Sequence, residues 1–320
     1  MSEQVQSISM PYDSAFKSII KKCPRLCLML INELFYHAGL SDEEYDGTEK
    51  VILLDKELPS LVTRNYEEDV RVQVIGKTTR IYHLECQTTP DGTIILRMFV
   101  YDTLAAIDEA KISDSKIVVE IDNSGVLFLR NPGNVRDTLT VEIRAPQGKK
   151  LTYEIPVLKI QNYSLDALLE KKLFVLLPFI FFNYERQLRK TPEDPVIYNR
   201  IRELFNTIFQ KLQGSITDNN LTAYEASTLL DALKVVFREL GNTNKAGKEV
   251  EEIMHGKVLE FSADKYYNEG EEKGKKEGER KGIIKVLASL VKDGILTEKA
   301  AAVRAEMTED EFRSVLESAS

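Results

Sequence analysis

The chain has 320 residues and a formal net charge of −8 at pH 7; 43% of its residues are hydrophobic and 29% are charged. These values are typical of a globular protein with room for a substantial core and two folding units. They exclude a protein that coats nucleic acid non-specifically through a basic surface.

The cysteines and the apolar runs bear on the cellular setting. The cysteines, Cys23, Cys27 and Cys86, are too few for a disulfide framework, which predicts a reducing, cytoplasmic environment. Cys23 and Cys27 have the spacing of a metal pair on a helix, but no His or Cys follows at ligand spacing, so buried free thiols are favoured. The first ten residues lack the basic and apolar regions of a targeting segment, so none is expected, and the longest apolar run, 173–182, is about half as long as a membrane span. We therefore expect no membrane segment.

The first part of the chain predicts helices followed by a β-hairpin. Residues 12–38 have apolar positions at three- and four-residue spacing, and Pro24 divides or kinks this helical stretch. Residues 51–62 are ambiguous. Between residues 69 and 87 the apolar period changes to two, with a turn at 76–77, which predicts a hairpin.

The middle of the chain predicts the rest of a sheet. Residues 93–110 form a largely apolar helix, and the continuous β-branched run at 116–121 predicts a strand covered on both faces. Segments 138–145 and 151–160 flank a Pro-Gln-Gly turn and predict a second hairpin. This order of elements predicts an α/β fold in which helices cover the faces of a mixed sheet.

From Ser164 the chain is predicted to be helical almost to its end, with helices at 165–188, 195–213, 222–240 and 246–268. The domain boundaries that follow are an α/β core at 1–163, a helical region at 164–268, a Gly- and charge-rich segment at 269–282 and a small helical tail at 283–320.

The segment 269–282 and the tail each have two interpretations. Glycines recur every four residues in the segment, and each costs a helix about 1 kcal/mol relative to alanine, which favours a solvated connector. Alternatively, a helix with a glycine face allows close approach to a partner helix. The tail is either a small helix-turn-helix unit or a helical cap or oligomerisation element, and a homo-oligomer formed through the helical C-terminal half is one expected partnership.

Acidic and amide side chains gather on one face of the first hairpin. Glu85 and Gln87 share a face of their strand, and a turn near Lys77 places Asp69 opposite Glu85, with Cβ atoms ~5 Å apart. Opposed carboxylates repel unless a cation neutralises them, and oxygen ligands suit Mg²⁺ or Mn²⁺. The Gln87 amide can position a water or phosphate, and the main-chain carbonyl of Cys86 is a candidate third ligand. Solvent-facing strands also commonly alternate Glu and Gln, which is the plainer explanation of the pattern.

The flanking helices supply candidate contacts to phosphate. Arg97 and Tyr101 lie four residues apart on the predicted helix after the hairpin, either as a phosphate-binding pair or as ordinary packing residues. Asp13 and Lys17 are either a helical ion pair or an element of the site in which Lys17 approaches the phosphate and Phe16 anchors the helix.

His83 shares the face of Glu85 and either lines the cleft or is a satisfied structural residue. Local positive charge for phosphate contacts is expected from a small group of basic residues: Arg64, Arg71, Lys77, Arg80 and Arg97.

Four of these motifs occur in the order of a known family. "DSAFK" at 13–17, "EEDVRV" at 67–72, "YHLECQTTP" at 82–90 and "LRMFVYD" at 96–102 resemble the Rpn family of recombination-promoting nucleases, also labelled transposases, in the PD-(D/E)xK nuclease superfamily. The resemblance covers about the first 110 residues motif by motif.

The resemblance implies a restriction-endonuclease-like core and a Mg²⁺-dependent DNA endonuclease. Asp69 and Glu85 would then be the metal carboxylates, and Gln87 stands where the superfamily usually has lysine. Arg97 and Tyr101 would face the site, and Asp13, Phe16 and Lys17 would form the N-terminal motif.

The sequence departs from the common pattern in small ways. Leu84 replaces the more usual isoleucine and Cys86 separates the acid from the amide. Because the strand has no lysine after Glu85, the alternative function is a nuclease-like scaffold with little or no activity that binds DNA or another protein.

Overall fold

The structure, a computed structural model, describes residues 11–54, 70–88, 92–191, 194–240, 247–257, 282–291, 296–305, 307–308 and 312–313. The chain divides into two compact units, Met1–Val258 and Leu259–Ser320.

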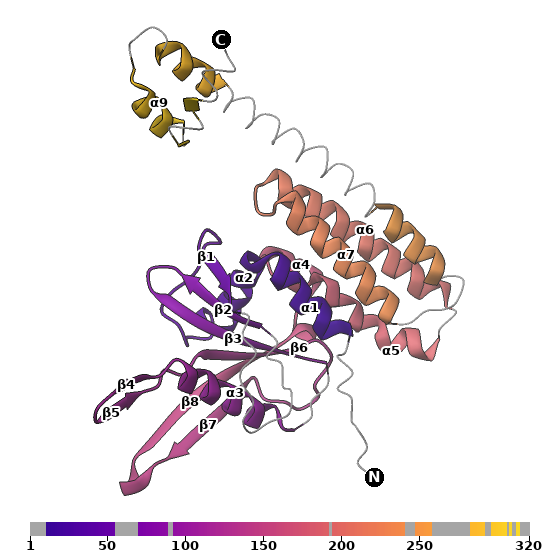
Figure 1. Ribbon diagram of the computed structural model, residues 1–320. Helices are drawn as coiled ribbons and strands as arrows, with labels where there is room; N and C mark the ends of the chain where they lie inside the picture. Colours follow the sequence, from indigo (N-terminus) through magenta and orange to yellow (C-terminus); the bar gives the residue numbers. More distant parts are fainter. Residues whose placement is uncertain are drawn as a thin grey trace, which may run out of the picture. The chain divides into compact units, whose positions relative to one another are not determined.

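The larger unit is built on a six-stranded mixed sheet with helices against it (Figure 1). In chain order its strands are β1 (Lys50–Leu53), β2 (Val70–Ile75), β3 (Thr79–Gln87), β6 (Asn123–Phe128), β7 (Thr138–Arg144) and β8 (Lys150–Lys159). The spatial order is β1-β2-β3-β6-β8-β7. β3, β6 and β8 are parallel to one another, whereas the other neighbouring pairs are antiparallel. The predicted α/β fold with a mixed sheet is confirmed.

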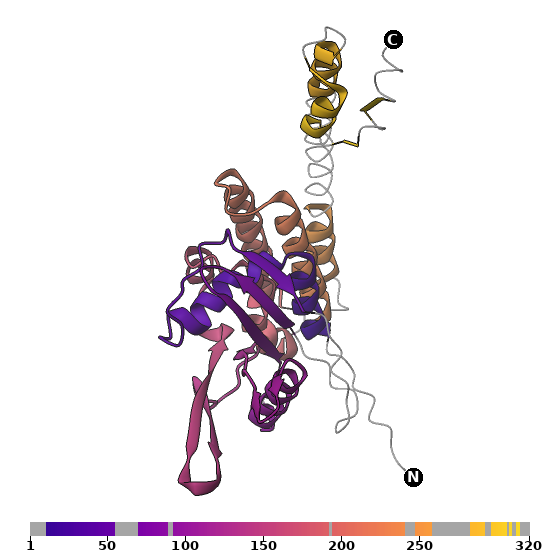
Figure 2. The same cartoon turned by 60° about the vertical axis from the view of Figure 1, so that its left-hand side comes forward.

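Both predicted hairpins are present. β2 and β3 pair antiparallel from Val70↔Leu84 to Ile75↔Thr79, around a turn at 76–78. β7 and β8 flank the 3₁₀ turn Pro146–Gly148, and their distal halves extend beyond the other strands in both views (Figures 1 and 2). Residues near this tip are exposed, so only the proximal part of the hairpin contributes to the core.

The strand predicted at 116–121 is wrong in length and place. Residues Lys116–Val118 form β5, which pairs only with β4 (Lys111–Ser113) in a separate two-stranded sheet. Ile112 and Ile117 face each other across this pair and are 79% and 58% exposed. The strand covered on both faces is β6, whose start, Asn-Ser-Gly, has little β propensity. β6 is extended because it is buried between β3 and β8, and the local sequence pattern does not predict this.

Helices cover the two faces of the sheet. On one face lie α1 (Pro11–Lys22) and a second helical stretch after Pro24, formed by the 3₁₀ turn Pro24–Cys27, α2 (Leu28–Ile31) and the π-turn Asn32–Tyr36. Phe35 packs on Tyr82 of β3 with ring centroids 5.1 Å apart. A Cβ on Gly125 of β6 would lie 3.2 Å from Phe35, so glycine permits this close packing.

The opposite face is covered by α3 (Ile94–Asp108). Ile94 and Met98 form a buried cluster with Val126 and Phe128 of β6 and with residues of β7 and β8. Strand alternation therefore sends Tyr82, Leu84 and Cys86 toward α2, whereas His83, Glu85 and Gln87 point to the α3 side.

A group of helices follows the sheet, and two of its members contact α1. The helices of this group are α4 (Leu165–Glu170), the 3₁₀ helix Phe174–Phe181, α5 (Phe182–Lys190), α6 (Pro195–Thr217), α7 (Ala223–Glu239) and a helix at 247–257. Glu225 closes a capping box with Thr222 and binds Arg25 through both carboxylate oxygens, at 3.0 and 2.6 Å. This bidentate contact fixes the start of α7 against the turn after α1.

The smaller unit has a helix at 282–291 and α9 (Glu298–Arg304). Its own core consists of Leu287, Ala288, Ala301, Ala302, Ala305 and Phe312. The segment 269–281 and Glu311 lie outside the described residues, so the predictions for them are not tested. Within the described ranges, the helices include none that combines the length and the apolar character needed to cross a membrane.

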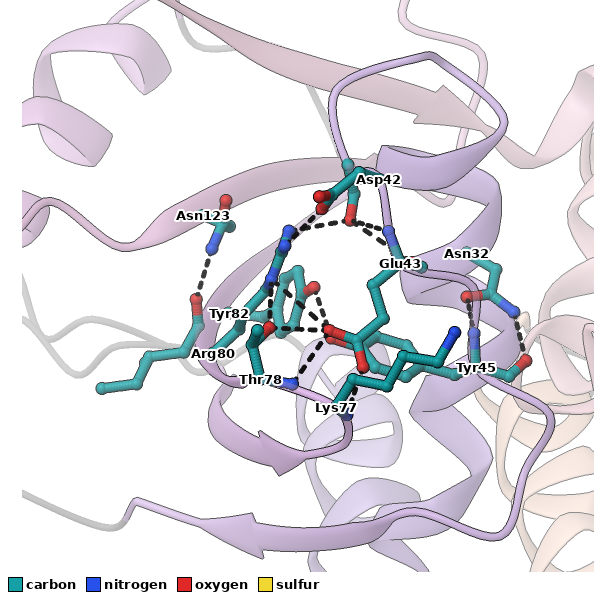
Figure 3. Close-up of polar contacts among 11 residues, drawn as sticks. Asn32, Asp42, Glu43, Tyr45, Lys77, Thr78, Arg80, Tyr82 and Asn123 are labelled. Carbon is teal, nitrogen blue, oxygen red and sulfur yellow. Dashed lines mark hydrogen bonds and ion pairs between the residues drawn. The ribbon is translucent and has the colours of Figure 1, made fainter.

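A buried carboxylate holds the turn between β2 and β3 (Figure 3). Glu43 accepts hydrogen bonds from Thr78 Oγ1 at 2.7 Å and from the Lys77 amide at 2.5 Å. Arg80 lies 3.7 Å away and also pairs with Asp42. Burial raises the pKa of Glu43, but the hydrogen bonds from Thr78 and Lys77 outweigh it, so the pKa is lowered overall.

Glu43→Gln should lower the free energy of unfolding at pH 7 by about 1–3 kcal/mol, because an amide cannot accept all of these hydrogen bonds. The lowered pKa means that the carboxylate stabilises the fold above the unfolded value of about 4.3 and loses this effect as the pH falls. Urea unfolding of both proteins should show a difference that is constant from pH 7 to 6 and shrinks toward pH 4. Glu44→Gln, at an exposed neighbour, is the control. Equal midpoints for Glu43→Gln and wild type at pH 7 would contradict this role.

Candidate functional site

The polar side chains predicted from the first hairpin lie between β3 and α3. His83, Glu85 and Gln87 alternate along β3, and the first two are 1% and 4% exposed. Parallel pairing places Ser124 beside His83 and Val126 beside Glu85 on β6. The site is therefore a strip of polar groups within an otherwise apolar interface.

Glu85 is the centre of this strip. Gln87 Nε2 donates to Glu85 Oε1 at 2.8 Å and to the main-chain carbonyl of Cys86 at 3.2 Å. Arg97 Nη2, from the first turns of α3, donates to the same Oε1 at 3.1 Å. A carboxylate and a carbonyl thus converge on one donor atom, beside a guanidinium whose side chain is 26% exposed.

His83 continues the strip away from Gln87. Its Nδ1 lies 3.0 Å from Asp102 Oδ1, and Ser124 Oγ donates to that same oxygen at 2.6 Å. Its Nε2 lies 3.9 Å from Glu85 Oε2. The Tyr101 ring meets the imidazole edge to face, with centroids 6.0 Å apart. Two residues of α3, Tyr101 and Asp102, therefore contact the imidazole, and Ser124 of β6 orients the Asp102 carboxylate.

A buried ion cluster closes the far end of the strip. Arg71 on β2 is 4% exposed, and its Nε donates to Asp122 Oδ2 at 2.6 Å while Nη1 donates to Glu109 Oε1 at 2.8 Å. Burial raises the pKa of Asp122, although Arg71 opposes this by hydrogen bonding. Burial alone would lower the pKa of Arg71, but these two carboxylates raise it overall.

Several of the predicted basic contacts are therefore occupied. The expectation that Arg71 meets phosphate is wrong, because its guanidinium is buried between two acids. Arg80 is engaged by Asp42 and Glu43, whereas Lys77 is exposed at the turn. Arg64 lies outside the described residues.

The remaining predicted residues have different outcomes. Phe16 is fully buried, with its ring centroid 6.3 Å from that of Phe179. Asp13 and Lys17 are half-buried on α1, which contacts β3. Asp69 lies outside the described residues; the observed β2–β3 register is the one used to predict that it pairs with Glu85, and the pairing stays a prediction.

The donor set can be compared with the needs of a divalent cation. In the described parts of the chain, no cluster of three or more His, Cys, Asp or Glu side chains is suited to hold a metal. What they do contain is a carboxylate of Glu85 and a carbonyl of Cys86 aimed at the same amide nitrogen, both hard oxygen donors of the type that Mg²⁺ prefers. Asp69, the other predicted ligand, lies outside the described residues, so the metal site stays a prediction.

Comparisons with known proteins assign no family to the chain. The chain matches no protein-family model, no curated protein and no solved structure.

Asp102 and Ser124 were missed from the sequence. Asp102 stands directly after Tyr101 in an apolar helix, and a charged residue on the buried side of such a helix was a readable signal. Ser124 gave none, because its strand was not predicted.

Proposed function

We propose that this protein is a Mg²⁺- or Mn²⁺-dependent endodeoxyribonuclease with a restriction-endonuclease-like core. The observation that carries the proposal is the convergence of the Glu85 carboxylate and the Cys86 carbonyl on one point at the end of β3, next to Arg97. The sequence motifs that resemble the Rpn family support it, and so does the mixed sheet in which β2, β3 and α3 surround that point.

The proposed roles follow from charge and position. Asp69 and Glu85 would hold the cation, which when bound polarises a phosphodiester and lowers the pKa of water. Gln87 already donates to both oxygens, so its amide lies where it can orient a water or a phosphate oxygen.

Positive charge at the rim would orient the DNA backbone. Arg97 is partly exposed and can turn from Glu85 toward a phosphate, and Lys17 on α1 is the second candidate. Tyr101 is 4% exposed and packs on His83. It would therefore contribute to DNA binding indirectly, by holding His83 and the neighbouring polar residues in place. Strand breaks made in this way would promote recombination.

A second candidate function is a nuclease-like scaffold that binds DNA or a protein without cleaving it. The burial of Glu85 and its ion pair with Arg97 favour this alternative, because buried polar networks also serve to fix a fold. The helical C-terminal half would then supply self-association or partner binding.

Cleavage of supercoiled plasmid DNA by the full chain tests the proposal. With Mg²⁺ or Mn²⁺ we expect nicked or linear product, and EDTA should stop its formation. Asp69→Ala, purified in parallel, should produce none. Equal cleavage by wild type and Asp69→Ala would remove the proposal, whereas salt-sensitive DNA binding without cleavage by either protein would favour the scaffold.

A further inference from the structure

The distal half of the β7–β8 hairpin, residues 142–152, forms an arm that projects beyond the sheet. It begins after the pair Val141↔Tyr153 and contains three further residue pairs, the last of which is Arg144↔Lys150. The arm extends past the other strands in both views (Figures 1 and 2). At ~3.4 Å per residue, these pairs carry the two-stranded ribbon about 10 Å beyond the buried part of the hairpin.

The two faces of the hairpin differ in chemistry. Paired residues of an antiparallel ribbon share a face, and successive pairs alternate between the faces. Val141, Ile143 and Tyr153 lie on the face that packs on the apolar cluster with Ile94 and Met98 of α3. The opposite face is polar and exposed, and it consists of Thr140, Glu142, Arg144, Lys150, Thr152 and Glu154.

Positive charge is concentrated at the tip of the arm. Arg144 and Lys150 are 83% and 63% exposed, and they share one carboxylate, that of Glu142, at 2.7 and 2.8 Å. Lys149 is a further exposed cation in the turn. The arm therefore contains three cations and one carboxylate, a formal charge of +2, whereas the whole chain has a net charge of −8. A positive tip on an acidic protein is complementary to a polyanion.

We propose that the arm binds duplex DNA, with Lys149 and Lys150 against backbone phosphates. The inference rests on the proposed function for the choice of DNA as the polyanion, and it places a DNA contact on residues separate from the candidate site. The major groove admits a two-stranded ribbon, and its depth of ~8.5 Å is close to the reach of the arm. Lysine contacts to phosphate fix the position of a protein on DNA and carry no sequence information.

The salt dependence of DNA affinity measures these phosphate contacts. Binding of the full chain to a short labelled duplex is titrated at several KCl concentrations in EDTA, so neither cleavage nor a bound cation affects the result. Lys149→Gln combined with Lys150→Gln should reduce the slope of log K against log salt by about 1–2, because each phosphate contact contributes ~0.9. The exposed ion pair that this variant loses contributes little to stability, so it should melt near the wild-type temperature.

The matched control removes the same charge elsewhere. Lys190→Gln combined with Lys211→Gln changes two exposed lysines, one on α5 and one on α6, and should keep the wild-type slope. A photo-crosslinking residue, p-benzoylphenylalanine, gives a positional readout. In place of Thr152 on the polar face of the arm it should crosslink to the duplex, whereas in place of Gln210, which is exposed on α6, it should not.

The outcomes separate this inference from the proposed function. An unchanged slope in the Lys149 and Lys150 double variant, an equal reduction in both double variants, or equal crosslinking from Thr152 and Gln210 would overturn the role of the arm. Loss of slope confined to the arm variant, in a protein that never cleaves DNA, would support the arm and remove the nuclease. No DNA binding by the wild-type protein would overturn both.

Discussion

Glu85→Gln should reduce metal-dependent DNA cleavage by roughly a thousandfold, since loss of a metal carboxylate removes several kcal/mol of transition-state stabilisation. The amide has the shape of the carboxylate but no charge, and it brings a donor to a place where Gln87 and Arg97 already donate. Cleavage rates of supercoiled plasmid, measured with saturating Mg²⁺ and with Mn²⁺, give the comparison.

The control for this variant is Glu120→Gln, because Glu120 is exposed and pairs only with Lys111 in the described part of the chain. It should cleave at the wild-type rate. Thermal melting of each protein separates loss of activity from loss of fold. Wild-type rates in a folded Glu85→Gln protein would show that this carboxylate takes no part in the chemistry.

Arg71→Met should lower the free energy of unfolding by about 3–5 kcal/mol, the usual effect of removing one partner of a buried ion pair. Methionine fills the space of the side-chain stem, so the loss comes mainly from Asp122, which stays buried without its 2.6 Å partner. Urea unfolding at pH 7 measures the difference.

The effect of Arg71→Met should depend on pH in a defined direction. The pKa of Asp122 is already raised by burial in the presence of Arg71, and it rises further when the guanidinium is removed. A folded-state pKa above the unfolded value of about 3.9 means that the folded variant takes up a proton first as the pH falls. Its deficit relative to wild type should therefore shrink between pH 7 and pH 5.

Arg144→Met is the matched control for Arg71→Met, because the same substitution there removes an 83% exposed side chain that pairs with Glu142. Its unfolding midpoint should stay close to that of wild type. A loss for Arg71→Met no larger than for this control, or a deficit that grows on acidification, would contradict the buried-cluster account.

The sequence predicted those helices and strands whose own residues carry a clear hydrophobic pattern. The β2–β3 hairpin, its turn and α3 follow from alternation, a Gly-Lys turn and an apolar helix. The contact of Arg97 with Glu85 was not predicted. β6 could not be predicted in this way, because its first residues gain their extended form from burial between two strands.

The ion pairs of the basic side chains could not be predicted from the sequence either. Arg71 alternates with apolar residues just as a solvent-facing residue would, and its acids, Glu109 and Asp122, come from loops far along the chain. Only the fold brings these groups together. The same holds for His83, whose carboxylate partner lies on α3 and whose neighbour Ser124 lies on β6.

Calorimetric titration of Mn²⁺ into metal-free wild type, Asp69→Asn and Glu85→Gln tests the central claim most directly. The claim is that Asp69 and Glu85 together hold one divalent cation. It predicts a saturable heat with one site per chain for the wild type, and the loss of that heat in both variants. Heats that are the same in all three proteins would contradict it.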